Sequence, residues 1–327
     1  MSNIEKKQNI CSCYVRRYVI EWKNKDVGIQ EVDRETLRAN TEASMDYKHG
    51  KIAQNILTLQ KEDGTWGNMF HSLAVPNNKT PLTTEQALRR LKGLGFTLED
   101  EPIRKAVDCM VSCLRGERRI DDYWEKTQDW NLFTKTMLST WVKIFDPGNE
   151  IALSFAKRWA NIIETAFSGG AYDDERLQRA YQQEFYQREK GTGKVEFVTF
   201  YQMNLLQGIL AKETESCMLD YVLRYEKGIY YIYGKSLNKV PEVFASIETS
   251  RYLAAVDILV GYQEAKKKLG FVAEWLEKNK DGNGQWDLGS KAKDNVYFPL
   301  SDSWRTVEAR KTDCTERIGA IIQKLSE

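Results

Sequence analysis

The chain has 327 residues, enough for one large domain or two ordinary ones, and 42% of them are hydrophobic, which suffices for a sizeable core. Lys and Arg number 48 against 47 Asp and Glu, so the sequence supplies no large basic field to neutralise phosphates. We therefore expect an ordinary globular protein that does not bind nucleic acid.

The N-terminus lacks the apolar core of a signal peptide, because Arg16 and Arg17 interrupt the only candidate stretch. No later segment approaches the roughly 18 apolar residues that a transmembrane helix needs. We expect a cytoplasmic protein with no transmembrane segment. The six cysteines fit that compartment as reduced thiols, since disulfide frameworks are typical of short secreted chains.

The first clearly delimited helix is predicted over residues 84–94. Thr83 and Gln86 have the spacing of a capping box, and Gly95 is typical of a helix that ends in the left-handed conformation. Three cations between residues 89 and 92 are unusual in a helix that we would otherwise assign to an inner wall.

Two kinds of helix alternate from about residue 101 to residue 280. Helices with apolar residues on one face and charges on the other are predicted over 103–114, 149–167, 214–226 and 263–279. Segments almost without charge lie between them, at 130–145, 197–211 and 252–262. A helix that is apolar all round is surrounded by protein. The charge-poor helices are therefore expected inside and the amphipathic ones outside.

This alternation predicts an all-α fold, an α/α toroid of about five to six helical hairpins. Each hairpin would contribute one helix to an inner ring and one to an outer ring. No Pro-rich, Ser-rich or low-complexity linker divides the chain into halves. We expect a helical N-terminal lead-in over residues 1–45 and one toroid domain over 46–327.

A short motif with an amide, a glycine and a tryptophan occurs twice, each time after an amphipathic helix. Its residues are Gln60, Gly64 and Trp66 in the first copy, and Asn279, Gly284 and Trp286 in the second. The amide can satisfy polar groups at a helix end, the glycine permits a chain reversal, and the indole can cover the amide. Both copies are predicted to be structural joints between helical hairpins.

With this repeat the chain resembles the terpenoid cyclase and protein prenyltransferase superfamily, whose α/α toroids carry Q-W motifs (the prenyltransferase and squalene oxidase repeat). The resemblance implies a central cavity, opening near the N-terminal ends of the inner helices, that holds an isoprenoid or steroid-like molecule. The D-x-D-D motif of class II cyclases is missing, and His49 and His71 precede the region where the zinc ligands of prenyltransferases would fall. Isoprenoid lyase or transferase chemistry therefore stays an open question.

Four acidic residues are the candidates for catalysis. Asp121 and Asp122, with Glu125, form a D-D-x-x-E triplet that could hold Mg²⁺ and a diphosphate, or could be a solvated loop that caps a helix. Asp173 and Asp174 stand where glycines give way to a helix, a position that favours capping over catalysis.

Aromatic and charged residues near the starts of the charge-poor helices, and at the expected start of the last helix over 301–310, are the candidates for lining the cavity. They are Trp130, Phe133, Phe197, Tyr201, Glu248, Arg251, Tyr252, Asp302, Trp304 and Arg305. Aromatic rings could stabilise a carbocation or stack on a sugar, and they are also what any barrel core contains. Arg305 could bind an anion or form a salt bridge, and Asp302 could cap the last helix.

No metal site is predicted outside the D-D-x-x-E triplet, and no cofactor other than Mg²⁺ is suggested. Cys11 with Cys13, and Cys109 with Cys113, lack a complementary set of Cys or His residues for zinc. The calcium-like order of acidic residues over 281–287 is better explained as the turn of the second motif copy.

Three functions are compatible with the sequence. The first is a toroid that binds a small apolar, isoprenoid-like molecule, with or without lyase or transferase chemistry. The second is a non-catalytic scaffold that binds a protein partner. The third is a carbohydrate-processing barrel, which would need two carboxylates facing one another from among Asp121, Asp122, Asp173, Asp174 and Glu248.

Overall fold

The computed structural model describes residues 47–67, 70–71, 82–120, 122, 129–185 and 194–326. The chain divides into two units, Met1–Met45 and Asp46–Glu327, and every described residue belongs to the second. The expected N-terminal lead-in, with Cys11 and Cys13, lies outside the described residues. All statements below concern the second unit.

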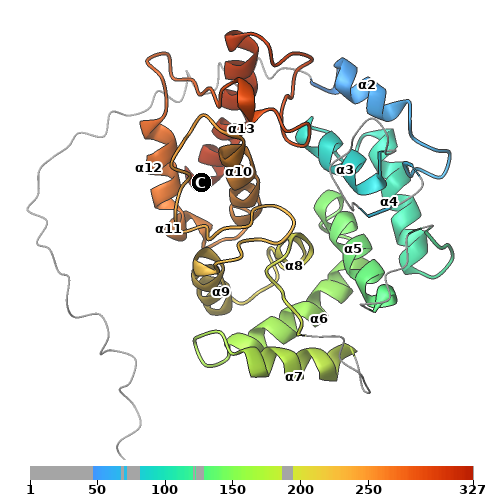
Figure 1. The fold of residues 1–327 in the computed structure, drawn as a ribbon. Helices are drawn as coiled ribbons and strands as arrows, with labels where there is room; N and C mark the ends of the chain where they lie inside the picture. The colour runs from blue at the N-terminus through green and yellow to red at the C-terminus, as the bar shows by residue number, and fades with distance from the viewer. Residues whose placement is uncertain are drawn as a thin grey trace, which may run out of the picture. The chain divides into compact units, whose positions relative to one another are not determined.

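The described residues form an all-α structure, with twelve α-helices, two short 3-10 helices and no β-strand (Figure 1). The α-helices are α2 (Lys51–Leu57), α3 (Thr84–Gly93), α4 (Glu101–Leu114), α5 (Trp130–Phe145), α6 (Glu150–Phe167), α7 (Asp174–Phe185), α8 (Phe200–Leu205), α9 (Lys212–Arg224), α10 (Ile247–Leu259), α11 (Ala265–Lys268), α12 (Gly270–Lys278) and α13 (Val307–Ser326). The 3-10 helices are η1 (Tyr47–His49) and η2 (Ser290–Ala292).

Local sequence signals set most helix boundaries. The Thr83 hydroxyl accepts from the Gln86 N–H and the Gln86 side chain accepts from the Thr83 N–H, which completes the capping box of α3. Helix α3 ends before Gly95, whose φ is +89°. Asp129 caps α5 and Asn149 caps α6 through their side-chain oxygens. These boundaries lie at or next to the positions expected from the sequence.

The structure differs from the expected helices in three places. The segment 197–211 contains only the six-residue α8, because Gly208 takes a left-handed φ of +70° soon after its end. The segment 263–279 is two helices, α11 and α12, which meet at Leu269. The last helix begins at Val307 rather than near residue 301, since the buried carboxylate of Asp313 accepts the backbone N–H of Ser301 and holds that stretch as a loop.

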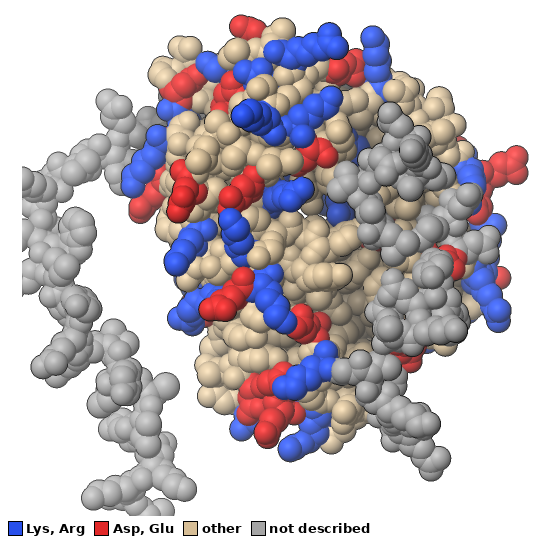
Figure 2. Space-filling model, viewed as in Figure 1, with Lys and Arg blue, Asp and Glu red and all other residues tan. Residues whose placement is uncertain are grey.

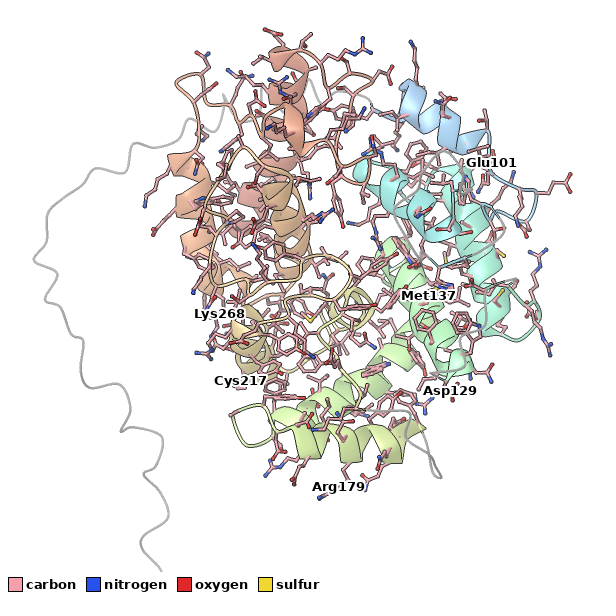
Figure 3. The ribbon with its side chains drawn as sticks, viewed as in Figure 1. Glu101, Asp129, Met137, Arg179, Cys217 and Lys268 are labelled. Carbon is pink, nitrogen blue, oxygen red and sulfur yellow. The ribbon has the colours of Figure 1, made fainter. Side chains whose placement is uncertain are left out.

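Burial separates the charge-poor helices from the amphipathic ones. In α5 every residue from Thr136 to Lys143 is buried, and α10 is buried on nearly all sides. Met137 of α5 lies in the interior, while Glu101 of α4 and Arg179 of α7 point outward (Figure 3). The core is therefore built around the helices that the sequence marked by their lack of charge.

Contacts between helices link the unit from its first helices to α13. Helix α5 packs against α4, α6 and α8, helix α10 packs against α8 and α13, and α12 packs against α13. The indole N–H of Trp141 in α5 donates to Glu85 in α3 over 2.6 Å. The Arg90 guanidinium, also in α3, donates to the carbonyl of Pro299. Helix α3 thus lies against the loop that precedes α13.

The visible surface carries charges of both signs, interspersed over the helices (Figure 2). Among the described residues, no helix is both long enough and apolar enough to span a bilayer.

Candidate functional site

The first motif copy fastens α2, α3 and α4 together. The Gln60 side-chain amide donates to the carbonyl of Gly64 at 3.0 Å and to that of Pro102, in the first turn of α4, at 2.8 Å. The Trp66 indole N–H donates to the carbonyl of Ile56 in α2 at 2.8 Å. The Trp66 backbone pairs with the hydroxyl of Thr84, the first residue of α3.

The second copy repeats this geometry around α12 and α13. The Trp286 indole N–H donates to the carbonyl of Leu276 at 2.8 Å, the same ten-residue offset as in the first copy. The Trp286 N–H donates to the Thr315 hydroxyl of α13 at 3.3 Å. Asn279, however, donates to Trp275 within its own helix and reaches no neighbouring helix. The indole hydrogen bonds of the two copies are thus equivalent, and the amide hydrogen bonds are not.

A cavity of about 550 Å³ lies among α3, α5, α8, α10 and α13. Its lining comes from the C-terminal halves of α3, α5, α10 and α13, from Phe200 and Asn204 of α8, and from loops beside these helices. The residues are Arg89, Lys92, Gly93, Gly95, Trp141, Lys143, Ile144, Pro147, Phe200, Asn204, Gln207, Gly208, Ile232, Ala254, Asp257, Ile258, Gly261, Val296, Tyr297, Leu300, Glu316, Arg317, Ala320 and Lys324. A cavity was expected at the N-terminal ends of the inner helices. This cavity lies mainly toward the C-terminal ends of α3, α5, α10 and α13 instead.

Cations outnumber acids in the lining. Five of the lining side chains are Lys or Arg, and only Asp257 and Glu316 are acidic. Asp257 is already engaged, since its carboxylate lies 3.0 Å from the Lys324 ammonium and 3.8 Å from that of Lys92. Burial would raise the pKa of Asp257, but these two cations outweigh it and lower the pKa to about 2.

Arg89 is the least satisfied of these cations. Its guanidinium stacks on Phe200 of α8 and on Tyr231, 4.6 Å and 4.7 Å from the ring centroids. The Nε and Nη2 atoms are buried and have no hydrogen-bond partner among the described residues. Within the same part of the chain Arg89 forms no ion pair. A buried guanidinium with unused N–H groups beside a cavity is what an anionic ligand would satisfy.

Arg317 of α13 faces the cavity from the opposite end of the sequence. Its guanidinium stacks on Tyr297 and Phe298, with 4.8 Å and 4.9 Å to the ring centroids, and donates to the Ser250 carbonyl at 3.2 Å. Burial lowers the pKa of Arg317, but an arginine stays protonated in proteins. Arg89 and Arg317 both line the cavity, which therefore has two guanidinium groups in its wall.

Aromatic side chains cluster at the N-terminal ends of α5 and α8, where the cavity was expected. Trp130 lies 5.1 Å from Phe133 and 5.2 Å from the His71 ring, and Phe133 lies 5.6 Å from Tyr201, all between ring centroids. The Tyr201 hydroxyl donates to the buried Glu85 carboxylate at 3.0 Å. These described side chains pack on one another, and none of them lines the cavity.

Three more of the expected aromatic residues belong to the packed core. Phe197 lies 5.7 Å from Tyr221 between ring centroids. Tyr252 is fully buried, and its hydroxyl donates to the Leu237 carbonyl at 3.1 Å. The Trp304 indole N–H donates to backbone carbonyls at the start of η2, 3.2 Å away.

The expected charged residues have structural partners or face outward. Glu248 pairs with Lys235 at 2.8 Å, and Arg251 and Arg305 are exposed. Asp302 does not cap the last helix, because that helix starts later, and it accepts from the backbone at the start of α2 instead. None of the ten residues predicted to line a cavity is among those that line this one.

The candidate catalytic carboxylates that the structure describes each bind a different partner. Asp121 and Glu125 lie outside the described residues, and Asp122 binds the His71 Nδ1 at 2.6 Å. Asp173 accepts from the Arg176 N–H at 3.0 Å in the first turn of α7, a capping bond. Asp174 pairs with Lys194 at 2.7 Å, and this hydrogen bond lowers its pKa. None of the described ones lines the cavity, and no cluster of metal-ligating side chains is found in the part of the chain that the structure describes.

The lining residues that sequence reasoning missed nevertheless left a signal. Lys143 is one of two charges in the segment 130–145, and Asp257 is the only charge in 252–262. Arg89 stands among the cations that were unexpected in an inner helix. An isolated charge in a charge-poor helix needs a partner or a ligand, and Lys143 and Asp257 meet that description.

No protein-family model, curated protein or solved structure matches the chain. The superfamily resemblance therefore rests on the two motif copies and on the order of the helices.

Proposed function

We propose that residues 46–327 form an α/α toroid of five hairpins. The outer and inner helices of these hairpins would be α2 with α3, α4 with α5, α6 with α8, α9 with α10, and α12 with α13. Support comes from the burial of the charge-poor helices α5, α8 and α10, and from the contacts that join α3 to α5, α5 to α8, α8 to α10 and α10 to α13. The bond between Arg90 and Pro299 would close the ring. Helices α7 and α11 would be additions to the pattern.

The central cavity is proposed to bind an organic anion with an apolar body, of which an isoprenoid diphosphate is the representative. The observation that carries this proposal is Arg89, which lines the cavity and whose buried Nε and Nη2 have no hydrogen-bond partner in the described part of the chain. An oxyanion would supply charge-assisted hydrogen bonds to both nitrogens. Arg317 would add a second positive charge on the same ligand group.

The rest of the lining suits a hydrocarbon. Trp141, Phe200, Ile232, Ala254 and Ile258 contribute apolar surface around the cationic groups. The volume of 550 Å³ falls within the range of about 300–1,000 Å³ that is usual for small-molecule sites. Charge at a few fixed points on an otherwise apolar wall favours an amphipathic ligand over a purely apolar one.

Carbohydrate processing is less well supported by this geometry. It needs two carboxylates across the cavity, and the lining contains only Asp257, which two lysines engage, and the exposed Glu316. A scaffold function has no comparable observation in its favour. We therefore retain the anion-binding proposal alone.

Thermal denaturation with three probes tests the proposal. Geranyl diphosphate should raise the melting temperature, because a ligand that binds only the folded state stabilises it. Geraniol, which lacks the anion, and inorganic diphosphate, which lacks the chain, should each raise it less. Absence of any shift with geranyl diphosphate at millimolar concentration would contradict the proposal.

A pair of arginine variants locates the binding. Arg89→Gln should weaken geranyl diphosphate binding about tenfold or more, since hydrogen bonds to charged groups contribute roughly 1.5–3 kcal/mol. Arg104→Gln removes an exposed cation on α4 and should leave the affinity unchanged. Equal affinities of the two variants would place the anion elsewhere.

A further inference from the structure

Lys143 presents a buried amine to the cavity. It lies in the last turn of α5, its residue is only 8% exposed, and it belongs to the cavity lining. Its Nζ donates to the backbone carbonyl of Gln207 at 2.7 Å. The Gln207 side chain is itself held, because its amide donates to the Ile258 carbonyl of α10 at 2.7 Å. The amine is therefore fixed in position between three inner helices.

No carboxylate neutralises this amine. Within the described residues Lys143 forms no ion pair and only the one hydrogen bond, which leaves two of three N–H donors unused. The other charged or titratable groups that face the cavity are Arg89 and Lys92 on α3, Asp257 on α10, Tyr297, and Glu316, Arg317 and Lys324 on α13. Asp257 is engaged by the lysines, and Glu316 is exposed.

The electrostatic environment favours the neutral amine. Burial lowers the pKa of Lys143 from 10.5 to about 8, and no neighbouring charge contributes to that shift. At pH 7 about a tenth of the side chain is then neutral, against roughly one part in three thousand for an ordinary lysine. A neutral amine has a lone pair for attack on an electrophile, and an ammonium does not.

We propose that Lys143 is a nucleophilic amine that captures the carbonyl carbon of an aldehyde or ketone bound in the cavity. The Nζ lone pair attacks the carbonyl carbon to give a carbinolamine, which loses water to leave an imine between Nζ and that carbon. No oxidant or reductant is consumed. The inference goes beyond the proposed anion site, because it requires the buried amine and the cavity but not the arginines.

A purely structural role is the competing explanation. In that case the ammonium only ties α5 to the end of α8, and its chemistry is of no consequence. Lys143→Arg separates the two roles, since a guanidinium can still donate to the Gln207 carbonyl but cannot form an imine. The melting temperature of the variant reports whether the tie between the helices is kept.

The test uses pyridoxal 5′-phosphate and pyridoxal as probes on the full-length protein at pH 7. Both carry an aldehyde on an aromatic ring, and only the first carries a phosphate. Borohydride reduces an imine to a stable secondary amine, which peptide mass mapping locates. Lys143 should be labelled at least about tenfold faster than Lys135, an exposed lysine on the same helix. Labelling of Lys143 should rise with pH around a midpoint near 8.

The two probes distinguish this inference from the proposed function. Fast labelling of Lys143 by both probes alike supports the reactive amine and counts against the anion site. A preference for the phosphorylated probe that Arg89→Gln abolishes supports both. Labelling of Lys143 no faster than of Lys135, in a protein that still binds geranyl diphosphate, would overturn the inference alone. Label that forms at the same rate in Lys143→Arg lies on other lysines and is subtracted from the total.

Discussion

The carboxylate of Asp302 accepts a hydrogen bond from the backbone N–H of Lys51 at 2.8 Å, although 251 positions separate the two residues. Lys51 begins α2, and the preceding residue, Gly50, has no side chain that could cap the helix. Asp302 therefore acts as an N-cap supplied from the other end of the unit. This bond joins the first helix to the segment before the last one.

Replacing Asp302 should weaken this junction in a graded way. Asp302→Ala removes the acceptor and should cost about 1 kcal/mol in the free energy of unfolding, while Asp302→Asn keeps an acceptor and should cost a few tenths. Urea denaturation measures both values. Hydrogen exchange at the Lys51 amide should quicken in the alanine variant, and an unchanged rate would show that the bond is not formed in solution.

The glycines of the two motif copies should respond differently to alanine. Both have positive φ, +86° at Gly64 and +76° at Gly284. A Cβ at Gly64 would lie 2.6 Å from the Lys105 backbone, whereas a Cβ at Gly284 meets nothing within 4 Å. Gly284→Ala should cost about 1 kcal/mol for the backbone conformation alone. Gly64→Ala should cost about 2 kcal/mol more, because the turn must move away from α4.

Urea denaturation of the two glycine variants measures the two losses of stability. The cost of the left-handed backbone is nearly the same at both positions, so the difference between the losses reports the clash with α4. Equal losses of stability would mean that the first turn does not pack closely on α4. That result would remove the argument that the motif acts as a joint.

Comparing Trp141 with Trp159 tests the buried polar network. Both are about 1% exposed, but the Trp141 indole donates to Glu85 at 2.6 Å while the Trp159 indole N–H has no partner among the described residues. Trp141→Phe should therefore destabilise the protein more than Trp159→Phe, by about 1–3 kcal/mol. Thermal denaturation of the two variants measures the difference, and a larger loss at Trp159 would contradict the described network.

Lys143 should reduce stability at neutral pH. Its pKa is lowered to about 8 in the folded protein, so between pH 8 and 10.5 the unfolded chain binds more protons, and stability rises with pH. Below pH 8 the full cost of burying the charge is present. Lys143→Met should raise the free energy of unfolding at pH 7 by up to about 3 kcal/mol, less the lost hydrogen bond.

The gain from Lys143→Met should shrink as the pH approaches 10. Denaturant titrations at pH 7 and pH 9.5 provide the comparison. A variant that is destabilised equally at both pH values would show that the ammonium is well solvated, contrary to its burial.

Hydrophobic periodicity and charge predicted the helices well. The bounds of α5 agree with the expected segment, and α4 and α6 agree to within two residues, because capping residues and Pro102 mark where each can begin. The failure at α13 has a specific cause. Asp302, the expected cap near position 301, binds the start of α2 instead, 251 positions away, and the Asp313 carboxylate holds Ser301 in a loop.

The sequence indicated what kind of residue could serve a site, but not where that site lies. The sequence indicated that a charge in a charge-poor helix needs a partner or a ligand, but this rule was applied to the helix ends that the superfamily resemblance favoured. Where a cavity forms depends on how side chains from different helices pack, as Trp130, Phe133 and Tyr201 do. Periodicity within one helix carries no information about that packing. Lys143 and Asp257 were visible as exceptions in their segments, without an indication that they share a cavity.

A crystal structure of the protein with a non-hydrolysable isoprenoid thiodiphosphate tests the central claim most directly. The account predicts a closed double ring of helices, with the thiodiphosphate between Arg89 and Arg317 and the hydrocarbon against Trp141 and Phe200. A ligand bound outside the ring, or an open bundle of helices whose charge-poor members face solvent, would contradict it.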